Sequence, residues 1–269
     1  MNRTKNILLS VVIPAYNESK RILRTLASLE RYFKPADYGY EVIVVSDGSK
    51  DVTADVVRTF GSMFPALRLI SYAKNRGKGH AVKQGMLSAR GEYRLFMDAD
   101  NSVSIENVET LLEEMEKSGS DVAIGSIAIP GARVVEGNGS HRRMLGSLSK
   151  VLVRSVALPG IYDTQRGFKL FTKRSADAIF PLQRINGFGF DIEILIIARE
   201  HGFKIKEVPV DWFNPAGSKV TPRAYLDSLI DLGRAVAYRL MGRYAPPKAP
   251  REKPRLSAAR IEGYARDAR

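Results

Sequence analysis

The chain has 269 residues, 44% of them hydrophobic, which is enough for one large α/β domain or two small ones with a sizeable core. It contains no cysteine, so disulfides, thiolate metal sites and thiol nucleophiles are excluded. Any catalytic chemistry must therefore come from oxygen and nitrogen groups. No apolar run reaches the roughly 18 residues of a transmembrane helix, so the sequence predicts neither a signal peptide nor a membrane span.

The net charge of +13 is concentrated in two segments. Residues 131–174 carry nine Lys and Arg against two acids, a net +7, and residues 242–269 carry eight against three, a net +5. The rest of the chain is therefore close to neutral. A local excess of positive charge predicts an anionic ligand or a polyanionic surface as a partner of the second half.

The first half of the chain alternates between strand-like and helix-like periodicity. A buried strand over 7–13 ends at Pro14, because proline cannot donate to a β-ladder. Further strands are predicted over 40–49, 67–73 and 93–100, and helices over 20–33, 49–63 and 77–89. This alternation predicts a Rossmann-like α/β fold, a mostly parallel sheet flanked by helices, with ligands beyond the carboxyl ends of the strands.

The second half is predicted to add helices and two more strands. Helices are predicted over 105–118, 143–157, 189–202 and 222–243, and strands over 121–127 and 204–212. The segment 163–180, DTQRGFKLFTKRSADAIF, receives no assignment. We expect three units: a domain over 1–221, an amphipathic membrane-interface helix over 222–244, and a basic, proline-containing tail over 245–269 that is disordered or folds on binding.

Four polar loops follow the predicted strands of the first half: Pro14–Glu18, Ser46–Thr53, Asn75–Ala81 and Asp98–Ser102. The carboxyl ends of parallel strands lie at one edge of a sheet, so these loops are expected to converge. Asp98 and Asp100 would then hold two carboxylates close together, and such a pair repels unless a cation neutralises it. Oxygen ligands suit Mg²⁺ or Mn²⁺, which would bridge to the phosphates of a nucleotide, and Lys78 in its Gly-rich turn would approach the same diphosphate.

Six motifs carry a resemblance to a known family. In chain order they are VVIPAYNE, VVSDGSKDVT, NRGKGHAVKQG, MDAD, DTQRGFKLF and GFGFDIEI. Together they resemble the motifs of family 2 glycosyltransferases with the GT-A fold. Within that family the chain is similar to polyprenyl-phosphate (dolichyl-phosphate) glycosyltransferases, nearest the dolichyl-phosphate glucosyltransferase type, over roughly residues 7–220.

This resemblance implies roles for particular residues. The nucleoside would be held by Pro14, Ala15, Tyr16, Glu18 and Asp47, with Lys78 near the base or the diphosphate. The DxD motif that binds nucleotide and metal would be Asp98, Ala99 and Asp100. The segment that receives the lipid phosphate contains Arg133, Arg142 and Arg143. Ser102 stands where mannosyl members often have a glutamine metal ligand, so water is expected in the ligand set.

The implied reaction is inverting transfer of a sugar from a nucleotide sugar, with UDP-glucose or a related UDP-sugar favoured, to a polyprenyl phosphate. A phosphate monoester has a second pKa of about 6 and is already largely dianionic at neutral pH, so it needs positioning and no general base. The residues expected to be catalytic are Asp98 and Asp100, which would hold the metal, and Arg143, which would orient the acceptor phosphate. Asp191 and Glu193 could shape the acceptor side, or act as a base if the acceptor were a hydroxyl, and Asp191 is added to the catalytic residues.

Two predicted amphipathic helices, over 143–157 and 222–243, combine apolar stripes with basic side chains and could lie in an anionic membrane interface. We therefore expect a cytoplasmic enzyme bound peripherally at the cytoplasmic face, with or without a separate membrane-protein partner. Two alternatives stay open: a family 2 transferase acting on a saccharide or other hydroxyl, and a basic nucleic-acid-binding protein. The latter leaves the acidic loops unexplained and lacks aromatics interleaved with the basic runs, so no nucleic-acid partner is expected.

Overall fold

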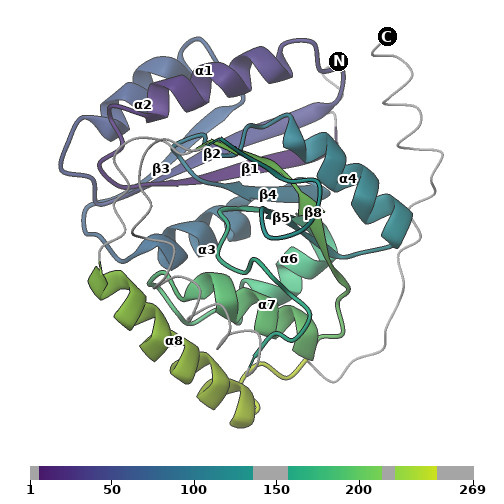
Figure 1. The fold of residues 1–269 in the computed structure, drawn as a ribbon. Helices are drawn as coiled ribbons and strands as arrows, with labels where there is room; N and C mark the ends of the chain where they lie inside the picture. The colour runs from purple at the N-terminus through teal and green to yellow at the C-terminus, as the bar shows by residue number, and fades with distance from the viewer. Residues whose placement is uncertain (1–5, 136–156, 214–221, 247–269) are drawn as a thin grey trace.

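The computed structural model describes residues 6–135, 157–213 and 222–246. Its centre is a seven-stranded sheet in the order β3-β2-β1-β4-β7-β5-β8 (Figure 1). The first four strands in this order are mutually parallel: β1 (Ile7–Ala15), β2 (Gly39–Asp47), β3 (Leu67–Tyr72) and β4 (Tyr93–Met97). The predicted α/β fold with a mostly parallel sheet is confirmed.

Helices cover both faces of the sheet, and each face has its own core (Figure 1). One face packs against α1 (Ile22–Phe33), α2 (Thr53–Gly61) and α4 (Asn107–Ser118). The other packs against α3 (Lys78–Ser88), α6 (Lys173–Ile179) and α7 (Phe190–Glu200). Successive strand residues point to opposite faces, so Val11 joins the first core and Val12 the second. The centres of β1 and β2 are apolar runs because both faces of the sheet are covered.

The segment that the sequence left unassigned, 163–180, contains β7 (Phe168–Thr172) and α6. β7 lies between β4 and β5 (Val122–Ser126) and runs antiparallel to both. Beyond β5, the edge strand β8 (Ile205–Pro209) is parallel to it. A late segment of the chain therefore enters the middle of the sheet and brings its preceding loop beside the end of β4.

A second, two-stranded sheet pairs β6 (Arg133–Val135) with β9 (Asp211–Phe213) in parallel. The strand predicted over 204–212 is therefore two strands, β8 and β9, separated at Val210. The Phe213 amide donates to the Ser102 carbonyl at 2.8 Å, so this ribbon lies beside the loop after β4. The helix predicted over 143–157 lies, apart from its last residue, outside the described residues, and so does the tail from residue 247 onward.

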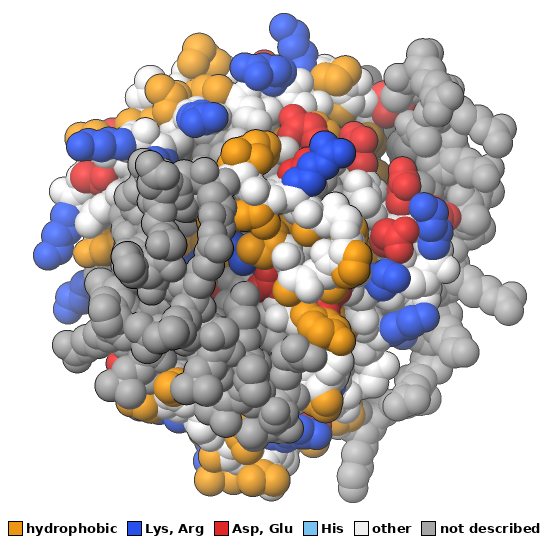
Figure 2. Space-filling view, viewed as in Figure 1, with side chains coloured by type: hydrophobic (Ala, Val, Ile, Leu, Met, Phe, Trp, Pro, Cys, Tyr) orange, Lys and Arg blue, Asp and Glu red, His pale blue; other side chains and the backbone are white. Residues whose placement is uncertain are grey.

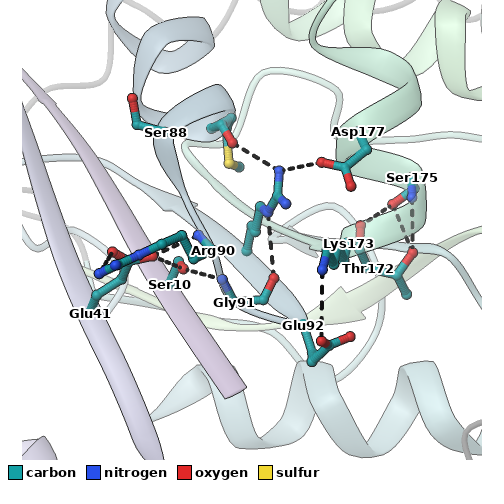
Figure 3. A network of polar contacts seen from close by, with 12 residues as sticks. Ser10, Glu41, Ser88, Arg90, Gly91, Glu92, Thr172, Lys173, Ser175 and Asp177 are labelled. Atoms are coloured by element: carbon teal, nitrogen blue, oxygen red, sulfur yellow. Dashed lines mark hydrogen bonds and ion pairs between the residues drawn. The ribbon is translucent and has the colours of Figure 1, made fainter. Parts of the chain in front are cut away.

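The amino ends of the parallel strands are joined by buried charges (Figure 3). Glu41, at the start of β2, accepts hydrogen bonds from the Ser10 hydroxyl and the Arg90 amide, both at 2.7 Å. Arg94, buried on β4, forms an ion pair with Asp177 of α6 at 2.8 Å. The fold itself satisfies these charges, so we assign them to stability and not to ligand binding.

The described chain ends against the second core. The helix α8 (Pro222–Leu240) packs on α7, and Leu232 and Ala235 are buried there. Tyr244, which follows α8, is also buried, and its hydroxyl donates to the buried Glu193 of α7 at 2.6 Å. Within the ranges that the structure describes, no helix combines the length and the apolar character needed to cross a bilayer.

Candidate active site

The loops after β1 and β2 meet at the carboxyl edge of the sheet, as the alternation predicted. They are joined by hydrogen bonds from the Asn17 amide to the Ser49 hydroxyl (3.1 Å) and from the Glu18 amide to the Thr53 hydroxyl (2.8 Å). In return, the Lys50 amide donates to the Asn17 side-chain oxygen at 2.7 Å. Asn17 has a φ of 54°, a left-handed conformation that asparagine tolerates better than most residues.

Asp47, the last residue of β2, joins the second loop to the third. Its carboxylate is buried, and Oδ2 accepts the amides of Arg76 (2.9 Å) and Gly77 (2.7 Å). Gly77 has a φ of 109°, and a Cβ there would lie 2.3 Å from the Asn186 carbonyl oxygen, so this turn requires glycine. The other oxygen, Oδ1, is buried and has no hydrogen-bond partner in the described part of the chain. A buried acceptor without a partner is costly, so Asp47 Oδ1 marks a position where a ligand could supply a donor.

The two acids of the MDAD motif follow β4, and each lies near a cation. Lys78 Nζ is 2.7 Å from Asp98 Oδ1, and Arg21 Nη1 is 3.9 Å from Asp100 Oδ2. Burial and the charge of Asp98 raise the pKa of Asp100. Burial alone would lower the pKa of Lys78, but the carboxylates of Asp98 and Asp191 together raise it. The edge therefore holds two acids, each with a positive charge beside it.

This acidic pair fits a hard divalent cation. The side chains of Asp98 and Asp100 are 28% and 24% exposed, so a ligand can reach their oxygens. Over residues 6–135, 157–213 and 222–246, no group of three or more Asp, Glu, His or Cys side chains is placed to hold a metal. Magnesium-like ions commonly use one or two carboxylates together with waters and substrate phosphates. Asp98 and Asp100 would therefore hold such an ion jointly with a nucleotide and not in a closed protein cage.

A buried ion pair lies next to Lys78. Asp191, predicted to be catalytic, is 3% exposed and forms an ion pair with the fully buried Lys169 of β7. Lys169 also donates to the Arg166 carbonyl at 2.6 Å. Burial raises the pKa of Asp191 and lowers that of Lys169, and the contact between them opposes both shifts. Lys169 was not predicted as a site residue, although a lysine inside the otherwise apolar run FKLF is a signal for one.

Gly167 explains why the DTQRGFKLF motif belongs to this site. Its carbonyl accepts the Asp98 amide at 3.0 Å, and a Cβ at this position would lie 2.0 Å from Asp98 Oδ2. The preceding Arg166 is held by Asp163, with 3.2 Å between Nε and Oδ2, and lies over the Trp212 ring at 5.1 Å. The entry into β7 therefore determines where the Asp98 carboxylate can lie.

The predicted nucleoside-binding residues of the first loop lie at the same edge. Pro14 and Ala15 end β1, and Tyr16 directly after them is exposed. Glu18 forms two contacts of 2.7 Å with the guanidinium of Arg21. Arg21 was not predicted as a site residue; the only signal for it is its position three residues after the glutamate of the first motif.

The other predicted residues are only partly described. Ala99 lies between the two acids, and its carbonyl accepts the Thr25 hydroxyl of α1 at 2.7 Å. Arg133 is exposed on β6. Arg142 and Arg143, predicted for the acceptor phosphate, lie outside the described residues. Their assignment stays a prediction.

An open α/β sheet with charged loops at its carboxyl edge is typical of enzymes that bind nucleotides there. The sequence profile described as Glycosyl transferase family 2 matches residues 10–180 of this chain. The chain therefore belongs to glycosyl transferase family 2, and it is a glycosyltransferase, as its six motifs predicted.

Curated relatives carry a more specific name. The dolichyl-phosphate beta-glucosyltransferase of Dictyostelium discoideum is 37% identical to this chain, over an alignment that spans 82% of this chain and 71% of the relative. The dolichyl-phosphate beta-glucosyltransferase of Homo sapiens is 38% identical over 80% of this chain and 70% of its own length. These relatives confirm the predicted resemblance to the dolichyl-phosphate glucosyltransferase type.

A solved structure shares the fold. It is glucosyl-3-phosphoglycerate synthase from Mycobacterium tuberculosis in complex with Mn²⁺, UDP and glucosyl-3-phosphoglycerate. The TM-score is 0.61 at 20% sequence identity, over 90% of this chain and 82% of the other. A likeness at this level of identity supports the fold and leaves the substrate to other arguments.

Proposed function

We propose that this protein transfers glucose from UDP-glucose to a polyprenyl phosphate, with inversion at the anomeric carbon. The main support is the contact between Asp98 and Lys78 at the carboxyl edge of the sheet. The chain's curated relatives are named dolichyl-phosphate beta-glucosyltransferases. The acidic pair would hold a metal ion together with the donor diphosphate. The lysine would stabilise the negative charge that develops when the diphosphate leaves.

The donor site is assigned to the first three loops. The unpartnered Oδ1 of Asp47 would accept the imide N–H of a uracil base, which would satisfy this buried oxygen. Pro14, Ala15, Tyr16 and Glu18 would surround the nucleoside from the first loop. A UDP donor is preferred because the DTQRGFKLF segment resembles that of the glucosyl-transferring type, whose name the curated relatives carry.

Asp98 and Asp100 would hold Mg²⁺ or Mn²⁺ together with the donor diphosphate. Such an ion, when bound, supplies positive charge to the leaving diphosphate. Lys78 would add a second positive charge from the protein. Its Nζ lies 5.3 Å from the centre of the Phe96 ring and 6.0 Å from that of Phe188, and these contacts limit where the ammonium can lie.

The buried acids favour a phosphate acceptor over a hydroxyl acceptor. A hydroxyl would need a general base, whereas a phosphate dianion needs only to be oriented. Asp191 is enclosed and paired with Lys169. Glu193 accepts hydrogen bonds from the backbone amides of Arg184 (2.9 Å) and Ile185 (2.8 Å) and from the Tyr244 hydroxyl. Neither buried acid is therefore free to act as a base. In this proposal Asp191 acts on Lys78 through its charge and is not a base.

Orientation of the acceptor phosphate is assigned to Arg133, Arg142 and Arg143. Arg133 lies exposed on β6, in the ribbon that contacts the loop after β4. The three arginines would bring the attacking phosphate oxygen to the anomeric carbon. Of these, Arg143 is the predicted catalytic residue.

The helix α8 supports attachment to an anionic membrane surface, which we place at the cytoplasmic face. Its exposed side chains include Leu229, Ile230 and Leu240, and Met241 follows directly. Hydrophobic side chains gather at the lower margin of the molecule, over the end of α8 (Figure 2). Apolar side chains accompanied by arginines suit the boundary between headgroups and acyl chains. A separate membrane protein would be an additional anchor.

Vesicle binding tests the attachment. The double substitution Leu240→Glu and Met241→Glu should reduce cosedimentation with phosphatidylserine vesicles. Met63→Glu, which changes an exposed methionine after α2, should not. Equal loss in both variants would contradict a role for α8.

A donor and acceptor screen tests the reaction. Purified protein would be incubated with UDP-glucose, UDP-galactose or GDP-mannose and a short polyprenyl phosphate, polyprenol or disaccharide, with Mn²⁺ or Mg²⁺. We expect glucosylated polyprenyl phosphate by mass spectrometry, with a signal lost on chelation and in Asp100→Ala. Product with polyprenol or disaccharide but none with the phosphate would overturn the proposal.

A further inference from the structure

The helix α8 reaches the candidate active site through one short segment of the chain. On the basis of the proposed function, in which Lys78 stabilises the leaving diphosphate, we propose that Asp231 of α8 is a positioning residue for this lysine. Asp231 acts through residues 183–189, which we call the 183–189 segment. It holds this segment against the turn at the start of α3, and that turn carries Lys78 towards Asp98.

The 183–189 segment is hydrogen-bonded to both backbone groups of Gly79, the residue after Lys78. The Asn186 carbonyl accepts the Gly79 amide at 2.7 Å. The buried Gln183 side chain donates to the Gly79 carbonyl at 2.8 Å. The segment therefore fixes the first turn of α3 through its main chain, next to the residue whose side chain enters the site.

Glycines on either side of Lys78 bring the two backbones close together. A Cβ on Gly77 would lie 2.3 Å from the Asn186 carbonyl oxygen. A Cβ on Gly79 would lie 2.5 Å from the Ile185 carbonyl oxygen. Lys78 thus stands between two residues whose backbones touch the segment. Because closely packed atoms transmit strain, a shift of the segment must move Lys78 as well.

Asp231 is the residue of α8 that meets this segment. Its side chain is buried, and its Oδ1 lies 3.2 Å from Arg234 Nη1. A Cβ on Gly189 would lie 2.2 Å from the Asp231 Cβ, and one on Gly187 would lie 3.0 Å from its Oδ2. Phe188, between these glycines, has its ring centre 6.0 Å from the Nζ of the same lysine. The contact at Asp231 therefore supports the part of the segment that borders the ammonium.

The contact at Asp231 borders a cavity between α8 and the segment. This cavity has a volume of about 410 Å³ and is lined by Arg184 and Asn186 on one side and by Asp227 and Tyr238 on the other. An open volume has no atoms in contact across it and cannot hold the two parts together. Support of the segment by α8 is therefore concentrated at the close contact beside the cavity.

Gly189→Ala tests this contact. Gly189 has a φ of −68°, which alanine adopts without strain. Its new methyl group would meet the Asp231 Cβ at 2.2 Å, so α8 and the segment must separate by about 1.2 Å to reach the 3.4 Å of an ordinary contact. Hydrogen–deuterium exchange, measured by mass spectrometry of peptides that contain Gly79, should become about tenfold faster or more. The kcat for glucosyl transfer should fall by about tenfold or more, with the KM for polyprenyl phosphate unchanged.

A double-mutant cycle with Lys78→Gln shows whether the loss passes through Lys78. In the Lys78→Gln background, Gly189→Ala should lower the residual kcat by less than about twofold. A merely structural role would give the same fold-loss in both backgrounds. Adding Asp231→Gly to Gly189→Ala removes the clashing Cβ and should restore most of the kcat, whereas adding Asp231→Ala keeps that Cβ and should not.

Gly233→Ala is the matched control within α8. A Cβ at this exposed position meets no atom within 4 Å, so both the kcat and the exchange should stay unchanged. If Gly189→Ala does not fold, the same cycle is run with Asp231→Ala alone. This variant removes the carboxylate that faces the segment and should lower the kcat by a smaller factor, again only when Lys78 is present.

The possible results are separable. Unchanged kcat or unchanged exchange at Gly79 in a folded Gly189→Ala protein overturns the inference. Equal fold-losses with and without Lys78 also overturn it, because a positioning residue must act through the side chain that it positions. Absence of glucosyl transfer in the unchanged protein would overturn the proposed function instead. The exchange at Gly79 would then still decide whether α8 supports the turn that carries Lys78.

Discussion

The contact between Gly167 and Asp98 allows a prediction that separates activity from stability. In Gly167→Ala the new Cβ would lie 2.0 Å from Asp98 Oδ2 and 2.2 Å from its Cγ. Since an ordinary contact is at least 3.4 Å, the carboxylate must move by about 1.4 Å. The carboxylate is the end of a short side chain that can rotate, so folding should lose only about 1 kcal/mol.

Activity should fall much more than stability. Displacing a reacting group by about 1 Å can cost about 100-fold in rate, equivalent to roughly 2.7 kcal/mol of transition-state stabilisation. We expect a loss of about this size in kcat/KM for glucosyl transfer to a polyprenyl phosphate, and a thermal unfolding midpoint near that of the unchanged protein. Gly61→Ala is the matched control, because a Cβ there meets no atom within 4 Å. Full turnover by Gly167→Ala would refute the assignment of Asp98.

Three further predictions concern other parts of the molecule. Asp47→Asn keeps one oxygen, which cannot accept hydrogen bonds from both the Arg76–Gly77 turn and a nucleotide base. Calorimetry should therefore show UDP binding weakened by about tenfold or more. Unchanged affinity would remove Asp47 from the nucleoside site. Tyr244→Phe takes a donor from the buried carboxylate of Glu193 and should lower the free energy of unfolding in urea by about 1–3 kcal/mol, whereas an unchanged midpoint would show that this bond contributes nothing. Hydrogen bonds from Thr53 and Ser19 outweigh burial and lower the pKa of Asp51 to about 2, so its stabilising effect is present above about pH 4 and is lost as the pH falls towards 2. The unfolding free energy of Asp51→Asn should therefore vary less over that range, and an equally steep fall would contradict the assigned pKa.

Local patterns were sufficient for much of the fold and part of the site. Buried strands appear as short apolar runs, and β1 to β4 alternate with α1 to α3 in the predicted order. The alternation also implied that the ends of these strands share one edge, which brings Asp47, Lys78 and Asp98 together. These features could be predicted because each element depends on residues close together in the chain, and the alternation of elements then decides which strand ends share an edge.

Only the tertiary structure decided which distant segments meet at that edge. β7 enters between β4 and β5, and this places Gly167 against Asp98 and Lys169 against Asp191, although these partners lie far apart along the chain. Arg21 reaches Asp100 in the same way, from the beginning of α1. The two acids can be recognised in the sequence as the motif MDAD. The charged groups that surround them depend on the order of the strands, because the energy of a charge is set by its neighbours in space.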